Sequence, residues 1–251
     1  MLLYDCFWGK DDGIKYRRFD QSKIDIQTMQ YIRMVFIHIL SVFLFAGFFF
    51  ESGPFKQYLY LQVWTAYLSF ASLILNYIAT EQQLLYPDRV YGKKLILWHC
   101  ALIILEISLP LNITASFGYW VFNDLGDYKK KQLIYWYKVG FHILPFIFGY
   151  LDLKLNKFLF RSFHYIVLFC VGVVYTILNK AWTEITGEPV YLLLNWKDIG
   201  VIQMFVGGSF IIFTISYFTI WCKSLRYNKS ETDLKDNNQD LEYSKIITSN
   251  N

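Results

Sequence analysis

Six runs of about 20 or more mostly apolar residues dominate this chain of 251 residues. A helix needs roughly 20 such residues to cross the hydrocarbon core of a bilayer. The runs lie at 31–50, 59–79, 94–122, 133–153, 160–179 and 201–222. Because 55% of the residues are hydrophobic, a soluble domain of this size would expose large apolar patches. The pattern therefore predicts an all-α fold, a polytopic membrane bundle of six transmembrane helices.

Basic residues are distributed unevenly over the segments between these runs. If the chain crosses six times, one side carries 16 or 17 Lys and Arg residues and the other side carries six. The positive-inside rule then predicts that both termini are cytoplasmic. We expect a polar cytoplasmic segment at 1–30, the transmembrane domain at 31–222 and a polar, disordered cytoplasmic tail at 223–251. The endoplasmic reticulum and the plasma membrane are the expected locations, and an organelle inner membrane also fits.

The remaining composition narrows the possible partners. A net charge of +4 is small and scattered along the chain, so we expect no nucleic-acid partner. Four dispersed cysteines are too few for a disulfide scaffold or a zinc site, and we expect no metal or other cofactor. The expected partners are membrane lipids, together with other subunits if the chain belongs to a larger membrane complex.

Histidines inside the spans are the first candidates for function, because ionisable groups are expensive in a membrane and usually face a protein interior. Each of the four lies in a different run: His38, His99, His142 and His164. At about 1.5 Å per residue, His142 lies near the midplane and the other three lie closer to the cytoplasmic side. We therefore predict a functional role for His142 and, for the other three, hydrogen bonds at the membrane interface or between helices.

A polar stripe in the second run could supply a partner for His142. Gln62, Thr65 and Ser69 are spaced i, i+3 and i+7, so they share one helix face that should turn inward. A hydroxyl beside an imidazole is the minimal unit of acyl-transfer chemistry, with the imidazole as base. Asn112 in the third run could donate to an oxyanion. Small polar residues also join helices, so the stripe alone leaves a structural role open.

Four motifs follow one another at a characteristic spacing. The third run contains ISLPLNITASFGYW, which ends in the pair Tyr119-Trp120, and the fourth continues from His142 as HILPFIFGYLDL. The fifth begins with RSFHYIVLFCVGVVY, and the loop TGEPVYLLLNW follows it. In this order, from about residue 55 to 222, they resemble the rolling-stone family and its relatives, the androgen-induced membrane proteins.

The resemblance implies an intramembrane hydrolase. The androgen-induced members are threonine hydrolases of fatty-acid esters of hydroxy fatty acids, with a Thr in the second span and a His in the fourth. His142 matches that His. The family's Tyr-Leu-Thr aligns with Tyr60-Leu61-Gln62, which places Gln62 at the nucleophile position. Thr65 lies one turn further along the same face, about 4.5 Å along the axis.

Three hypotheses follow from these patterns. In the first, the chain is a lipid-ester hydrolase in which Thr65, or as second choice Ser69, attacks the ester carbonyl while His142 takes the proton and Asn112 supports the oxyanion. In the second, the chain has lost its nucleophile at Gln62 and serves as a non-catalytic scaffold or accessory subunit. In the third, two of the shallower histidines ligate a b-type haem.

Overall fold

The computed structural model describes residues 24–50, 56–85, 94–122, 132–155, 160–191, 194 and 196–225. These residues form helices and short connections, and no strand is found among them. The predicted all-α fold is therefore confirmed for the described part of the chain. Most of the polar segment expected at 1–30, and most of the tail expected at 223–251, lies outside the described residues.

Each apolar run coincides with a helix. The helices are α2 (Ile26–Phe50), α3 (Leu61–Leu85), α4 (Lys94–Phe122), α5 (Gln132–Leu155), α6 (Tyr165–Thr186) and α7 (Ile199–Ile202). Short 3₁₀ turns, η2 (Lys56–Leu59) and η4 (Ser162–His164), lie close before α3 and directly before α6. From α7 the chain stays helical through a π-helical turn, η5 (Gln203–Gly207), to the end of the apolar segment Ile199–Leu225. We call Ile199–Leu225 the C-terminal helix.

Five helical segments of the described chain are long and apolar enough to cross a membrane. They are Ile26–Gly47, Leu61–Gln82, His99–Trp120, Ser162–Thr186 and Ile199–Leu225. The expected count of six is therefore not confirmed, because α5 is not among them. The physical reason lies in its composition, since Lys138, His142, Asp152 and Lys154 lower its mean hydropathy.

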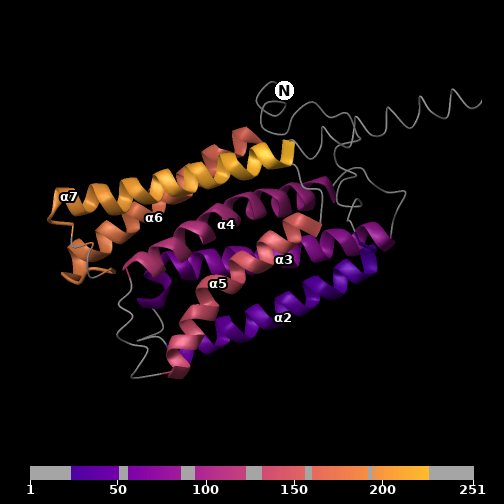
Figure 1. Cartoon of the computed structure of the whole chain (residues 1–251), viewed down its shortest axis with the longest axis horizontal. Coiled ribbons are helices and arrows are strands. Elements are labelled where there is room, and N and C mark those ends of the chain that lie inside the picture. Colours follow the sequence, from indigo (N-terminus) through magenta and orange to yellow (C-terminus); the bar gives the residue numbers. More distant parts are fainter. Residues whose placement is uncertain are drawn as a thin grey trace, which may run out of the picture.

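The helices run side by side along the long axis of the molecule (Figure 1), and α3 contacts α2, α4 and α5. On the other side of α4, α6 and the C-terminal helix lie next to each other (Figure 1). A cluster that includes Leu109 of α4, Leu168 of α6 and Phe213 of the C-terminal helix joins these two parts. Large apolar side chains such as Phe45 and Ile211 point outward, as expected for helices that face lipid.

Two clusters of charged and polar side chains are buried between the helices. In the first, Nε of Arg33 in α2 lies 2.7 Å from Oδ1 of Asp152 in α5, and both side chains are fully buried. Asn76 of α3 donates to the other oxygen of Asp152 at 2.8 Å. The guanidinium of Arg33 also donates to the backbone oxygen of Asn76 and to the hydroxyl of Thr80. This cluster connects α2, α3 and α5.

The second buried cluster connects α4 to the segments that follow α5. Glu106 of α4 accepts from Nδ1 of His164 at 2.6 Å and from the backbone N–H of Arg161 at 2.9 Å. The hydroxyl of Tyr217 in the C-terminal helix lies 3.3 Å from the same carboxylate. The expected role of His164, a hydrogen bond between helical segments, is confirmed by this contact.

Candidate functional site

A cavity of about 420 Å³ lies between α3, α4 and α5 on one side and α6 and the C-terminal helix on the other. Its walls are mostly apolar, with a few polar side chains, which is the usual character of a small-molecule site. The polar or ionisable side chains among its described lining residues are Tyr60, Gln62, Thr114, Tyr119, Lys138, His142, Tyr175, Thr176, Asn179, Tyr191, Trp196 and Ser209.

The imidazole of His142 forms part of the cavity wall. Its side chain is only 5% exposed, and it stacks on Tyr119 with the ring centroids 3.8 Å apart. Nδ1 is buried and has no hydrogen-bond partner among the described residues. The backbone oxygen of His142 accepts from Ser116 of α4 at 2.6 Å, which fixes α5 against α4 at this level. The ring is held by packing and lines the cavity, whereas Nδ1 itself has almost no accessible surface and does not face the cavity.

Gln62 lines the same cavity as His142. These are the two positions that the resemblance aligns with the nucleophile and the base of the androgen-induced proteins, and the fold brings both to one site. The side-chain amide of Gln62 can donate and accept hydrogen bonds, but it is not a nucleophile.

Thr65, Ser69 and Asn112 are each at most 2% exposed, so the inward orientation predicted for Thr65 and Ser69 is confirmed. The hydroxyl of Thr65 donates to the backbone oxygen of Gln62 at 2.9 Å. Asn112 donates to the hydroxyl of Ser69 at 2.6 Å, which joins α4 to α3. None of the three is among the described residues that line the cavity. The structure therefore brings His142 and Gln62 to the cavity, and the catalytic roles of Thr65, Ser69 and Asn112 stay predictions.

A chain of hydrogen bonds joins residues of the cavity wall, and the sequence did not predict it. The backbone N–H of Leu61 donates to the hydroxyl of Tyr191, which lies 2.9 Å from the hydroxyl of Tyr175. Tyr175 in turn donates to the backbone oxygen of Leu59 at 2.8 Å. Burial raises the pKa of Tyr191, so its hydroxyl keeps the proton that it donates. The loop after α6 is thus attached to the start of α3.

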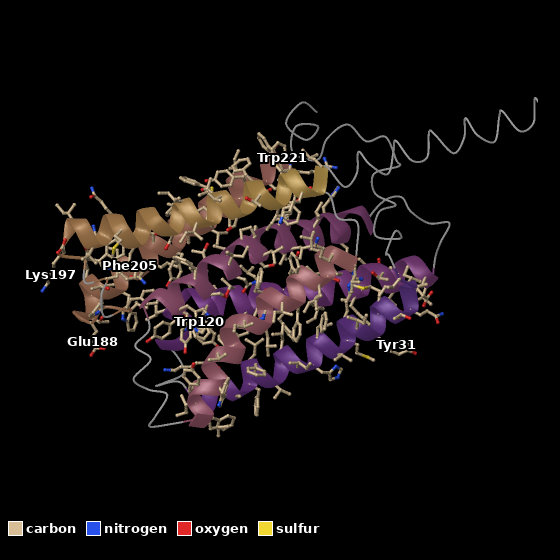
Figure 2. The ribbon with its side chains drawn as sticks, in the orientation of Figure 1. Tyr31, Trp120, Glu188, Lys197, Phe205 and Trp221 are labelled. Carbon is tan, nitrogen blue, oxygen red and sulfur yellow. The ribbon has the colours of Figure 1, made fainter. Side chains whose placement is uncertain are left out.

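Trp196 holds the same loop to α6. Its indole N–H donates to the side-chain oxygen of Asn179 at 3.0 Å, and its backbone adopts a left-handed conformation with φ of 60°. A non-glycine residue in that conformation is unusual and is often found at functional sites. Figure 2 shows Phe205, which also lines the cavity, at the same end of the molecule as Glu188 and Lys197. The sequence signal for Tyr191 and Trp196 was the presence of two aromatic side chains in the loop after α6.

Two of the histidines that were predicted to lie closer to the cytoplasmic side, His38 and His164, have different surroundings. His38 is exposed on α2, with Nδ1 2.7 Å from the backbone oxygen of Met34, whereas His164 is buried against Glu106. Within the described ranges, no group of three or more His, Cys, Asp or Glu residues could hold a metal ion. The haem hypothesis stays a prediction that a visible absorption spectrum can test.

No protein-family model matches the chain, and comparisons with curated proteins and with solved structures find no match.

Proposed function

We propose that this protein binds an ester with a long acyl chain inside the membrane and hydrolyses it with His142 as general base. The observation that carries the proposal is the imidazole of His142 in the wall of a largely apolar cavity that Gln62 also lines. The apolar walls suit an acyl chain, and the polar side chains suit its ester group. The resemblance to intramembrane hydrolases supports the same reaction.

The arrangement favours water as the attacking group. The hydroxyl of Thr65 already donates to the backbone of Gln62 and does not line the cavity. A water molecule would attack the ester carbonyl while His142 accepts its proton, and the amide of Gln62 would donate to the oxyanion. Attack gives a tetrahedral intermediate. When it collapses, the bond between the carbonyl carbon and the alkoxide oxygen breaks, and the imidazolium of His142 gives its proton to the leaving alkoxide. The products are a fatty acid and an alcohol.

The proposal includes six membrane crossings with cytoplasmic termini, and α5 is the sixth. Two of its polar groups are shielded from lipid by protein, because Asp152 pairs with Arg33 and His142 lines the cavity. Lys138 also lines the cavity. Ionisable residues are tolerated in a span when they face a bundle interior in this way. A protease-protection assay that places the C-terminal tail on the lumenal side of sealed vesicles would contradict this topology.

A second candidate function is non-catalytic: a lipid-binding scaffold or an accessory subunit of a membrane complex. The specific observation that favours it is Gln62, an amide at the position where the androgen-induced proteins have their nucleophile. In this case the cavity would hold an acyl lipid, and His142 would be one of its polar contacts.

Purified protein in mild detergent can separate the two functions. We would measure hydrolysis of 4-methylumbelliferyl palmitate by the wild type and by His142→Phe, with His38→Phe as the matched control at an exposed histidine. A hydrolase loses turnover in His142→Phe and keeps it in His38→Phe. Thr65→Val reports on the nucleophile, because it abolishes turnover if Thr65 attacks and leaves it largely intact if water attacks.

Gln62→Thr tests the non-catalytic alternative directly. If wild-type protein neither hydrolyses the ester nor reacts with a fluorophosphonate probe, while Gln62→Thr reacts at residue 62, the chain has the site of a hydrolase without its nucleophile. A wild type that cleaves no ester contradicts the hydrolase proposal in either case. If Gln62→Thr does not react with the probe either, the cavity is also not a hydrolase site that lacks only its nucleophile.

A further inference from the structure

The described part of the cavity wall contains one positively charged side chain. Of the described residues that line the cavity, Lys138 is the one charged at neutral pH, and it lies one helical turn before His142 on the same face of α5. No Asp or Glu is found among those lining residues. The salt bridges of the described side chains join Arg33 to Asp152, His164 to Glu106 and Lys180 to Glu184, and Lys138 takes part in none of these.

An ammonium beside a largely apolar space is costly unless an anion accompanies it. Two pairs of ionisable side chains in the described bundle, Arg33 with Asp152 and His164 with Glu106, are fully buried. The residue Lys138 is partly buried, and it contributes to the wall of the cavity. A bound anion would form charge-assisted hydrogen bonds with it.

We propose that Lys138 binds a carboxylate of the ligand and is the residue that selects anionic, single-chain amphiphiles over neutral ones. This inference rests on the proposed function, because it takes the same cavity as the binding site. The carboxylate would lie at Lys138 and the chain would extend along Phe205, Phe210 and Phe213, which line the cavity from the C-terminal helix. An ester bound in this way would carry a free carboxylate in addition to the ester group. The ester carbonyl would lie within reach of His142, which is one helical turn from Lys138.

Photoaffinity labelling tests the inference. The probe is palmitic acid that carries a diazirine and an alkyne, and the labelled peptides are identified by mass spectrometry. Labelling of cavity-lining peptides is competed with palmitic acid, methyl palmitate and lysophosphatidic acid. The variants are Lys138→Met, Lys138→Arg and, as matched control on the same helix, Lys154→Met, because Lys154 does not line the cavity.

We expect palmitic acid to compete at a concentration about tenfold lower than methyl palmitate in the wild type, in Lys138→Arg and in Lys154→Met. Lys138→Met should remove this difference. Equal competition by acid and ester in the wild type, or an unchanged difference in Lys138→Met, overturns the inference. Stronger competition by lysophosphatidic acid than by palmitic acid also overturns it, because the preferred anion is then a phosphate.

The two proposals fail in distinguishable ways. A preference for the acid that depends on Lys138, without ester turnover, supports the carboxylate site and removes the hydrolase. Ester turnover that depends on His142, without any preference for the acid, keeps the hydrolase and removes the role of Lys138. Labelling that is confined to peptides outside the cavity overturns both.

Discussion

The Arg33–Asp152 cluster and the His142 cavity differ in how their ionisable groups are paired, although Nη2 of Arg33 and Oδ1 of Asn76 in the first region also have no partner among the described residues. Around Asp152, both carboxylate oxygens have donors from α2 and α3. In the cavity wall, Nδ1 of His142 has no partner among the described residues. A paired buried charge holds helices in one arrangement, because removing either partner leaves the other unsatisfied. A buried polar group without a partner lowers stability, so its presence in a cavity wall suggests a role other than holding the fold. The comparison predicts that stability depends on the first region and activity on the second.

The largest expected effect is on stability, from breaking the Arg33–Asp152 pair. Arg33→Met leaves Asp152 buried without its cation, which should lower the free energy of unfolding by about 3–5 kcal/mol. Unfolding in mixed detergent micelles, followed by tryptophan fluorescence, measures it. The double variant Arg33→Met with Asp152→Leu should lose less than Arg33→Met alone. A double variant less stable than the single one would show that the pair is not the source of the effect.

Glu106→Gln should have a smaller effect on the same measurement. The amide keeps the size of the carboxylate but weakens the contact with Nδ1 of His164, so we expect a loss of about 1–3 kcal/mol. His164→Asn is the companion change from the other side, because it removes the same contact. If the two changes are fully additive in the double variant, Glu106 and His164 do not interact and the second cluster is wrongly assigned.

The hydrogen bonds that Tyr191 makes with Leu61 and Tyr175 should contribute less to the free energy of unfolding than the two buried clusters. Tyr191→Phe removes one hydroxyl between Leu61 and Tyr175, and a loss of about 1 kcal/mol is expected. The loop should also open more often, which hydrogen exchange of residues 187–198 would detect. Tyr150→Phe on α5, outside the cavity lining, is the control and should change neither quantity. Unchanged exchange in Tyr191→Phe would mean that other contacts hold the loop.

The smallest stability change is expected for His142 itself. His142→Phe keeps an aromatic ring against Tyr119 and removes the unpartnered nitrogen, so the free energy of unfolding should change by less than about 1 kcal/mol. Ester turnover or ligand labelling should nevertheless be lost. A large destabilisation by this change would assign His142 to the structural class of Arg33 and Asp152, and would remove the contrast between the two regions.

Much of the fold could be predicted from local hydropathy. The run at 94–122 has the same bounds as α4, and the spacing of Thr65 and Ser69 correctly predicted that both turn inward. The helix bounds and the inward turn were predictable because apolar length and helical periodicity are properties of consecutive residues. Gln62 and His142, which the resemblance aligns with a nucleophile and a base, both line one cavity, and their roles stay predictions.

Tertiary structure decided the rest. Arg33 and Asp152 are 119 positions apart, and only the packing of α2 against α5 shows that they form a pair. The same holds for the cavity, where the rotation of α3 exposes Gln62 to the space beside His142 and leaves Thr65 bonded to its own helix. Hydropathy states how long a helix is and how apolar it is. Which neighbour each polar side chain meets depends on how the helices are rotated and packed, and no single stretch of sequence contains that information.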